Sequence, residues 1–368
     1  MNYKQQMDFA VYKTRENMRI FKYAFPMSQS TNYNYRPEAC MEWTSGFFSG
    51  MEMLAYEYTK DEAFLKSAKF HAEIFRHRID NKIEVDHHDM GFLYSLACVS
   101  LYKVTGDEFA KETALLAADQ LMTRFNPIGK FIRAWGDMKD ESKNRLIIDC
   151  LLNIPLLYWA AEVTGEVRYK DVADAHLNTT INVIIRDNNT THHTYFFDLK
   201  TGAPLRGETA QGHSDDSCWA RGQAWGIYGA ALAYHYTGDE RLPDFFRRVT
   251  GEFIKRLPED FIPYWDMDFT DGSDEPRDTS SAAIACCGIL EMSKYIDCSE
   301  YLPYVDKMMK SLAENYTSTR LDFESNVILT DGMYARTQGH EPEGTIFGDY
   351  FYMEALMRLI NKDWEMYW

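Results

Sequence analysis

Two kinds of hydrophobic run alternate along the chain, and both predict helices. The first kind is apolar on all sides and occupies residues 43–58, 89–105, 147–163, 219–236, 278–295 and 348–360. The second is apolar on one face and occupies residues 3–24, 62–78, 108–125, 166–185, a run after Glu240, and 301–316. A helix of the first kind is buried, whereas one of the second kind covers a core with one face. Six of each predict an all-α fold, an (α/α)6 barrel with an inner and an outer ring.

Short polar segments join the paired runs into helical hairpins. Thr-Gly-Asp-Glu ends an apolar run at residues 105–108 and again at 237–240, and Thr-Gly-Glu ends another at 164–166. Glycine adopts the left-handed conformation that ends a helix, and Asp then caps the next one. We therefore expect six helical hairpins in a single domain over residues 1–368, although a chain of this length more often forms two domains.

In such a barrel the inner helices run parallel, so their N-termini share one end. The long connections lead to this end; they are residues 25–42, 79–88, 125–146, 186–218, 257–277 and 317–347. Connections of this length in a compact domain are usually functional. One of them contains a predicted β-hairpin with a Thr-Gly turn at residues 194–204. We expect the functional site at this end of the barrel.

Composition narrows the class of protein. The net charge is −17 and no basic cluster occurs, so we expect no nucleic-acid partner. No run looks transmembrane, and residues 1–20 contain no apolar signal segment, so we expect no membrane partner. The seven cysteines lack metal-ligand spacing, which is typical of buried free thiols in a reducing compartment. A cytoplasmic enzyme is the simplest class that fits.

A single carboxylate, Asp149, lies near the start of the apolar stretch Arg145–Trp159, which we expect to be helical. Burial disfavours the charged form of a carboxylate and raises its pKa, which makes a general acid near neutral pH. Asp89 opens the preceding inner helix, so the two can form a carboxylate pair. The alternative is that each Asp only caps the N-terminus of its helix.

The segment His87-His88-Asp89 also suggests a metal site, but neighbouring residues on a helix point in different directions. No Cys-x-x-Cys or His-Glu-x-x-His segment supports a metal. A nucleophile elbow, a phosphate-binding loop and a dinucleotide fingerprint are also missing from the sequence. We therefore expect no metal and no cofactor.

One arginine stands among aromatic residues in the segment Trp219-Ala-Arg-Gly-Gln-Ala-Trp225. A guanidinium can bind a carboxylate through two parallel hydrogen bonds, and the neighbouring rings offer stacking surfaces for a sugar. This segment predicts that Arg221 holds the carboxylate of an acidic sugar.

Seven segments carry a resemblance to a known family. They are Glu42-Trp-Thr-Ser-Gly-Phe47, Asp86-His-His-Asp-Met-Gly-Phe-Leu-Tyr-Ser95, Ala134-Trp-Gly136, Ile147-Ile-Asp-Cys-Leu-Leu-Asn153, Trp219-Ala-Arg-Gly-Gln-Ala-Trp-Gly-Ile-Tyr-Gly229, Arg277-Asp-Thr-Ser-Ser-Ala282 and Gly348-Asp-Tyr350. Together they resemble the unsaturated glucuronyl hydrolases, glycoside hydrolase family 88, over nearly the whole chain. The fold of that family is an (α/α)6 barrel, in agreement with the repeat count.

The resemblance implies a substrate and a reaction. Polysaccharide lyases leave a C4=C5 unsaturated uronate at the non-reducing end of a disaccharide, and this family removes it by hydrating the vinyl ether. Asp149 matches the family's acid/base, which protonates C4 and helps water add at C5. Asp89 matches the second carboxylate, which holds sugar hydroxyls and sets the charge state of Asp149. We expect a glycosaminoglycan-derived disaccharide, from chondroitin or hyaluronan, as the substrate of a monomer or homodimer.

Eight further positions match residues that contact substrate in the family. His193, Gln211, Trp219, Arg221 and Trp225 match binding positions for the unsaturated sugar, Trp43 and His88 complete its pocket, and Trp135 matches the platform for the next sugar. One departure concerns sulfated substrates. Members that prefer them carry Ser-x-x-Ser-x-Lys before the last inner helix, where this chain has Ala335-Arg-Thr-Gln-Gly-His340. We therefore expect no preference for 6-sulfated disaccharides, unless Arg336 and Thr337 replace the missing groups.

Three alternatives remain open. Unsaturated rhamnogalacturonyl hydrolases share the barrel and a related reaction, although the Trp-x-Arg-Gly-Gln-Ala-Trp segment argues against them. An inverting glycosidase acting on saturated chains would need an acid and a base about 6.5–9.5 Å apart. A non-catalytic carbohydrate-binding protein would have no need for a lone carboxylate buried among leucine and isoleucine.

Overall fold

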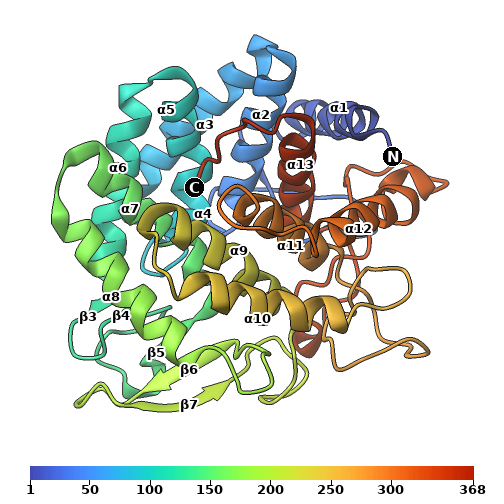
Figure 1. Ribbon diagram of the computed structural model, residues 1–368. Coiled ribbons are helices and arrows are strands. Elements are labelled where there is room, and N and C mark those ends of the chain that lie inside the picture. Colours follow the sequence, from blue (N-terminus) through green and yellow to red (C-terminus); the bar gives the residue numbers. More distant parts are fainter.

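The protein forms two concentric rings of helices in the computed structural model, which describes residues 1–368 (Figure 1). The inner ring consists of α2 (Ser45–Thr59), the composite helix α4 (Met90–Tyr94) with α5 (Ser100–Thr105), α7 (Pro155–Thr164), α9 (Ala220–Thr237), α11 (Thr279–Met292) and α13 (Ile346–Ile360). The outer ring consists of α1 (Tyr3–Phe21), α3 (Glu62–Asp80), α6 (Glu108–Met122), α8 (Val167–Val183), α10 (Leu242–Lys255) and α12 (Leu302–Asn315). This arrangement confirms the predicted all-α (α/α)6 barrel.

The apolar character of the inner helices corresponds to their burial. Every residue of α9 from Ala220 to Ala233 is buried, whereas the outer helix α10 buries one face and exposes the other. One hydrophobic cluster extends from Met7 to Trp368 and fills the space within and between the rings. None of the helices is both long enough and apolar enough to cross a membrane.

The predicted helix stops have the expected geometry. Gly106, Gly165 and Gly238 adopt positive φ angles of 73°, 74° and 61°, directly after α5, α7 and α9. Asp107 then caps α6 by accepting a hydrogen bond from the backbone N–H of Ala110 at 3.1 Å. These turns bring each inner helix back along an outer one and generate the hairpins.

The inner helix with α4 and α5 is not a regular α-helix throughout. Residues Ser95–Val99, between its two α-helical parts, form a π-helical segment. A π segment of this kind inserts an extra residue into an α-helix and is frequent near functional sites. The two turns on either side of it are therefore rotated relative to the positions that a continuous α-helix would give them.

The prediction of a helix from Ile147 is wrong in its first part. Strand β5 (Arg145–Ile147) is followed by a 3₁₀ turn, Ile148–Leu152, and α7 begins only at Pro155. Proline has no N–H to donate and a fixed φ angle, so it favours the first position of a helix. Asp149 consequently lies in the turn between a strand and a helix and does not cap α7.

A small antiparallel sheet borders the end of the barrel at which the inner helices begin. Strand β6 (Thr194–Phe197) pairs with β5 on one side and with β7 (Pro204–Glu208) on the other. The β6–β7 hairpin confirms the hairpin predicted at residues 194–204, and β5 extends it in a way the sequence did not suggest. Two shorter ladders join β1 (Phe25–Pro26) to β2 (Pro37–Glu38) and β3 (Phe125–Asn126) to β4 (Phe131–Ile132).

Candidate active site

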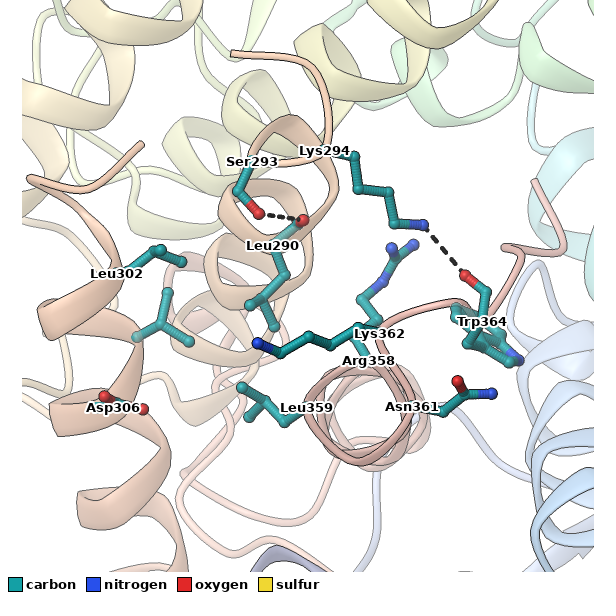
Figure 2. Close-up of a pocket in the computed structure, with 11 residues that line it drawn as sticks. Leu290, Ser293, Lys294, Leu302, Asp306, Arg358, Leu359, Asn361, Lys362 and Trp364 are labelled. Atoms are coloured by element: carbon teal, nitrogen blue, oxygen red, sulfur yellow. Dashed lines mark hydrogen bonds between the residues drawn. The ribbon is translucent and has the colours of Figure 1, made fainter. Parts of the chain in front are cut away.

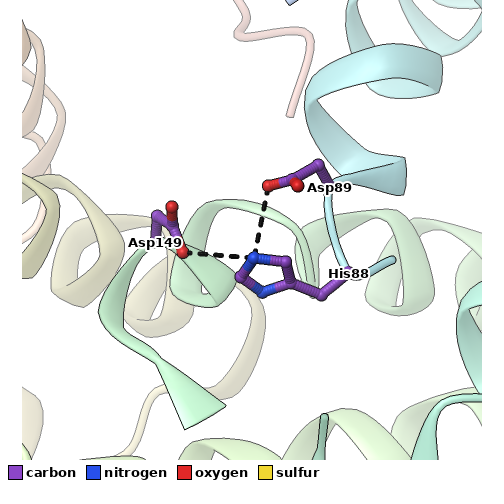
Figure 3. A group of neighbouring side chains, drawn as sticks. All are labelled: His88, Asp89 and Asp149. Carbon is purple, nitrogen blue, oxygen red and sulfur yellow. Dashed lines mark ion pairs between the residues drawn. The ribbon is translucent and has the colours of Figure 1, made fainter. Parts of the chain in front are cut away.

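The two predicted carboxylates meet at the start of the inner helices, with an imidazole between them (Figure 3). His88 Nε2 lies 3.4 Å from Asp89 Oδ1 and 3.6 Å from Asp149 Oδ1. One carboxylate oxygen of each aspartate and a ring nitrogen of His88 all lie within 4.8 Å of one another. His88 and Asp89 immediately precede α4, and Asp149 comes from the turn after β5.

The surroundings separate the pKa values of the two carboxylates. Burial, and then the charge of Asp89, raise the pKa of Asp149 well above its usual value, and only part of this is offset by Arg221. Burial also acts to raise the pKa of Asp89, but the His88 imidazole and a hydrogen bond from His87 outweigh it and hold that pKa below its usual value. Burial lowers the pKa of His88 to about 4, so its ring is neutral near pH 7. The two pKa values are therefore shifted in opposite directions, and a proton on the pair is favoured on Asp149 over Asp89.

Asn153 connects the segments that carry the two aspartates. Its Oδ1 accepts a hydrogen bond from the backbone N–H of Phe92 at 2.8 Å, and its Nδ2 donates to the backbone carbonyl of Asp149 at 3.1 Å. The approach is close, because a Cβ added at Gly91 would lie 2.5 Å from Cα of Asn153. This contact sets the separation between the start of α4 and the turn that holds Asp149.

Aromatic side chains surround the aspartate pair. The Trp43 indole N–H donates to the hydroxyl of Tyr334 at 2.9 Å, and its ring stacks on Phe347 with centroids 5.6 Å apart. The ring of Trp135 lies 6.1 Å from that of His88. His193 packs against Trp219 at 4.1 Å, and burial lowers the pKa of His193 to about 3, so it too is neutral. These rings form apolar walls with few charges.

Arg221 is held more tightly than the sequence suggested. Its side chain is 2% exposed and its guanidinium lies over the rings of Trp219 and Phe347. Its two terminal nitrogens donate to a carboxylate oxygen of Asp278, the backbone carbonyls of Met333 and Tyr334, and Oε1 of Gln211. All four terminal N–H groups therefore have protein acceptors. The amide nitrogen of Gln211, oriented by this contact, is the donor that remains available beside the charge.

Trp225 occupies a different place from the other predicted binding residues. It is 1% exposed and packs between Phe92 and Phe351, with ring centroids 5.4 and 5.5 Å away. On α9 it lies one helical turn below Arg221, on the same face. Trp225 therefore supports the aromatic wall from beneath.

Two other polar residues near the starts of inner helices, Gln223 and Asp349, are engaged by hydrogen bonds to the backbone. Gln223 binds the backbone of Thr191, Asn189 and Val249. Asp349 accepts hydrogen bonds from the backbone N–H groups of Ile328 and Leu329, and burial raises its pKa to about 7. Both hold loops that form the rim of the barrel.

Two residues that help to build the site, Tyr334 and Asn153, were not predicted individually from the sequence. Tyr334 lies in a long connection with no local signal, yet it contacts Trp43 and accepts from Arg221 through its backbone. Asn153 ends one of the segments that resemble the family, but its role depends on a contact with Phe92, which is distant in the sequence. Neither contact has a sequence pattern that would reveal it.

The aspartate pair with His88 is also the set of residues that comes nearest to a cation site. It offers two carboxylate oxygens and one ring nitrogen, fewer ligands than most structural cation sites use. The raised pKa of Asp149 favours a proton on one of these oxygens, and a proton there competes with a cation. The arrangement therefore suits proton transfer better than metal binding.

A separate cavity of about 430 Å³ lies at the far end of the barrel, where α11 and α13 end (Figure 2). Leu290, Leu302 and Leu359 form an apolar surface in it, and Lys294 donates to the backbone carbonyl of Trp364 at 3.1 Å. The cavity contains a single carboxylate, Asp306, and no acid/base pair. It has no part in the chemistry of Asp89 and Asp149.

Comparison with known proteins gives the family. The sequence profile described as Glycosyl Hydrolase Family 88 matches residues 16–365, which is nearly the whole chain. The chain belongs to glycoside hydrolase family 88. The resemblance recognised in the sequence is thereby confirmed, and with it the prediction of a glycosidase.

Relatives in this family are similar over almost their full length. The unsaturated chondroitin disaccharide hydrolase of Streptococcus pneumoniae is 44% identical, over 99% of this chain and 93% of its own length. The unsaturated glucuronyl hydrolase of Bacillus sp. GL1 is 39% identical, over 97% of this chain and 96% of its own. The crystal structure of the unsaturated glucuronyl hydrolase from Streptococcus agalactiae superposes with a TM-score of 0.94 at 42% identity, over 99% of this chain and 94% of that one.

Proposed function

We propose that this family 88 glycosidase removes a C4=C5 unsaturated uronate from the non-reducing end of a chondroitin-type disaccharide by hydrating its vinyl ether. The observation that carries the proposal is the close pairing, in an aromatic pocket, of Asp149, whose pKa is raised, with Asp89, whose pKa is lowered. The named activities of the relatives from Streptococcus pneumoniae and Bacillus sp. GL1 point to the same substrate class.

In the proposed reaction Asp149 donates its proton to C4 of the unsaturated sugar. Positive charge then develops at C5 and its ring oxygen, and the newly formed Asp149 carboxylate accepts a proton from the water that adds at C5. The product is a hemiketal, which opens and releases the second sugar. A raised pKa favours this sequence, because the acid must hold its proton near neutral pH and return to the carboxylate form during the step.

The remaining residues have proposed binding roles. Asp89 accepts hydrogen bonds from sugar hydroxyls, and its charge keeps Asp149 protonated. Gln211 donates its amide N–H to the uronate carboxylate, while Arg221 behind it supplies positive potential in a low-dielectric setting. Trp43, His88, His193 and Trp219 enclose the unsaturated ring, Trp135 supports the second sugar, and Trp225 holds the wall in place.

The loop at residues 335–340 bears on sulfated substrates. Arg336 is engaged by Glu275 at 3.5 Å and by Glu341 at 3.0 Å, and His340 Nδ1 lies 2.5 Å from Oε1 of Gln29. A crystal structure of a mutant Streptococcus agalactiae enzyme is in complex with dGlcA-GalNAc6S, at 40% identity and a TM-score of 0.88. In this chain the cation of the loop is already neutralised, so we propose that unsulfated disaccharides are used at least as well as 6-sulfated ones.

Two alternatives fit less well. An inverting glycosidase keeps its carboxyl groups about 6.5–9.5 Å apart, whereas oxygens of Asp89 and Asp149 lie within 4.8 Å. A binding protein gains nothing from a carboxylate held protonated next to an ionised one. We further propose that residues 1–368 form a single catalytic domain, which acts as a monomer or homodimer on chondroitin and hyaluronan disaccharides. We place it in the cytoplasm, because its seven buried, unpaired cysteines favour a reducing compartment.

The test is turnover of an unsulfated unsaturated chondroitin disaccharide, followed by loss of ultraviolet absorbance of the conjugated acid. Performed in methanol–water, hydration predicts a methoxy group at C5 of the product. A methyl glycoside at C1 would indicate ordinary displacement and refute the mechanism. No turnover of any unsaturated disaccharide, with intact binding, would leave a binding protein as the better description.

A further inference from the structure

Arg145 is a half-buried cation without an acceptor. Its side chain forms no ion pair and no hydrogen bond, and its buried Nε has no partner. The guanidinium instead lies over two aromatic rings, 4.4 Å from the centroid of Trp135 and 5.3 Å from that of Phe196. Partial burial of an unpaired charge is costly, so the surroundings hold in place a cation that the protein itself does not neutralise.

Arg206 on the same sheet shows what a paired arginine looks like. Arg145 and Arg206 both lie opposite Phe196 in the register of β5, β6 and β7, so the three side chains share one face. Arg206 stacks on Phe196 at 4.9 Å, but its Nε also binds Oε1 of Glu208 at 2.5 Å. Glu208 is the acid whose charge reaches Arg145, and Arg206 already engages it. The sheet thus neutralises one of its two stacked arginines.

The unpaired guanidinium lies beside the active site. Trp135, on which it stacks, is adjacent to His88, and the charge of Arg145 acts on both His88 and His193. Strand β5 leads from Arg145 directly into the turn that carries Asp149. The cation therefore borders the region that Trp135 provides for the second sugar under the proposed function.

We propose that Arg145 binds an oxyanion, a sulfate ester, on the second sugar of the disaccharide. A stacked guanidinium keeps its N–H donors in one plane and presents them edge-on, the geometry that suits a sulfate or carboxylate. Arg145 belongs to β5 and not to the loop at residues 335–340 that aligns with the Ser-x-x-Ser-x-Lys segment. We therefore assign it to a sulfate at a position other than O6, with the 4-sulfated chondroitin disaccharide as the probe. This inference rests on the proposed function.

The experiment compares kcat/KM on unsulfated and 4-sulfated unsaturated chondroitin disaccharides for the wild type, Arg145→Gln and Arg206→Gln. Loss of a hydrogen bond to a charged group lowers affinity by about tenfold or more. We expect Arg145→Gln to lose about tenfold on the 4-sulfated substrate and much less on the unsulfated one. Arg206→Gln, the matched control on the same Phe196, should change neither. Arg145→Lys, which keeps the charge without the planar donors, should lie between.

A direct binding measurement separates this inference from the reaction. Calorimetry with the 4-sulfated disaccharide uses the Asp149→Asn protein, with and without Arg145→Gln. Weaker binding of the 4-sulfated but not of the unsulfated disaccharide supports the inference even if the mechanism is wrong. Equal losses for both disaccharides would mean that Arg145 only supports Trp135, and no loss for either would also overturn the proposal. A wild type that turns over the unsulfated substrate but excludes the 4-sulfated one would refute the inference and leave the proposed function intact.

Discussion

Asp89→Asn tests whether the aspartate pair shares a single proton. The substitution removes a negative charge at most 4.8 Å from an oxygen of Asp149 while keeping the size of the side chain. Two unit charges at 4.8 Å repel by about 3.5 kcal/mol at an effective dielectric constant of about 20. This repulsion and burial both favour the protonated form of Asp149, so the pKa of Asp149 should fall when Asp89 is neutral. Burial remains, so that pKa should stay above its usual value.

The sign of the effect on activity follows from the required protonation states. Wild-type activity needs Asp149 protonated and Asp89 ionised, so it should fall at low pH as Asp89 is protonated and at high pH as Asp149 is ionised. In Asp89→Asn kcat should be lower at every pH, because the ionised Asp89 is missing; in the residual activity the acidic limb due to Asp89 disappears, and the basic limb moves to lower pH. The assay is the pH profile of kcat on an unsulfated unsaturated disaccharide, with the melting temperature measured at each pH. An unmoved basic limb in a folded Asp89→Asn protein would refute the shared proton.

Three other predictions concern single steps of the same reaction. Asp149→Asn should lower kcat by about 10²–10⁴-fold or more, with substrate still bound in calorimetry; near wild-type turnover would remove Asp149 as the acid. Gly91→Ala should separate the two aspartate segments, because the added Cβ would lie 2.5 Å from Cα of Asn153. It should lower the unfolding free energy by about 1–3 kcal/mol in a denaturant titration and lower kcat more than it raises KM. An unchanged kcat would show that the spacing of the two segments is not critical. The ratio of kcat/KM on unsulfated to 6-sulfated disaccharides should be one or higher, and a strong 6-sulfate preference abolished by Arg336→Ala would contradict the proposed role of the loop.

The rings of the barrel were predictable because burial leaves a direct mark on a helix. An inner helix such as α9 is surrounded on all sides and can carry almost no charge, whereas α10 must pair an apolar face with a polar one. The strand β5 was not predictable by the same reasoning. A short apolar run has the same appearance in a buried strand and a buried helix, and only Pro155, ten residues after Arg145, marks where α7 begins.

The candidate site was predictable in its members and less so in their contacts. Asp89, Asp149 and the aromatic residues were predicted to lie together because each is near the start of an inner helix, and parallel inner helices all begin at the same end of the barrel. The sequence could not show that the connection at residues 333–334 crosses Arg221 and accepts its N–H groups through main-chain carbonyls. Main-chain acceptors have no side-chain signature, so an arginine that looks free in the sequence can be fully engaged in the fold. Arg145 shows the opposite: it stands at the start of an apolar stretch, its sequence position predicted no role for it, and in the fold its side chain has no acceptor.

The π-helical segment Ser95–Val99 acts as a fixed rotational offset between the body of its helix and the turn that follows Asp89. Each residue advances an α-helix by about 100°, so the same residues wound as a regular α-helix, with none removed, would turn the first part of the helix to face another way. Asp89 would then point away from Asp149, although every residue of the site was still present. A change at residues 95–99 that restored regular α-helical winding without removing a residue would therefore act as a catalytic mutation, although these residues lie more than five positions from either aspartate. The rotational register of this helix is therefore one of the conditions that bring Asp89 and Asp149 together, although no side chain in the pocket reveals it.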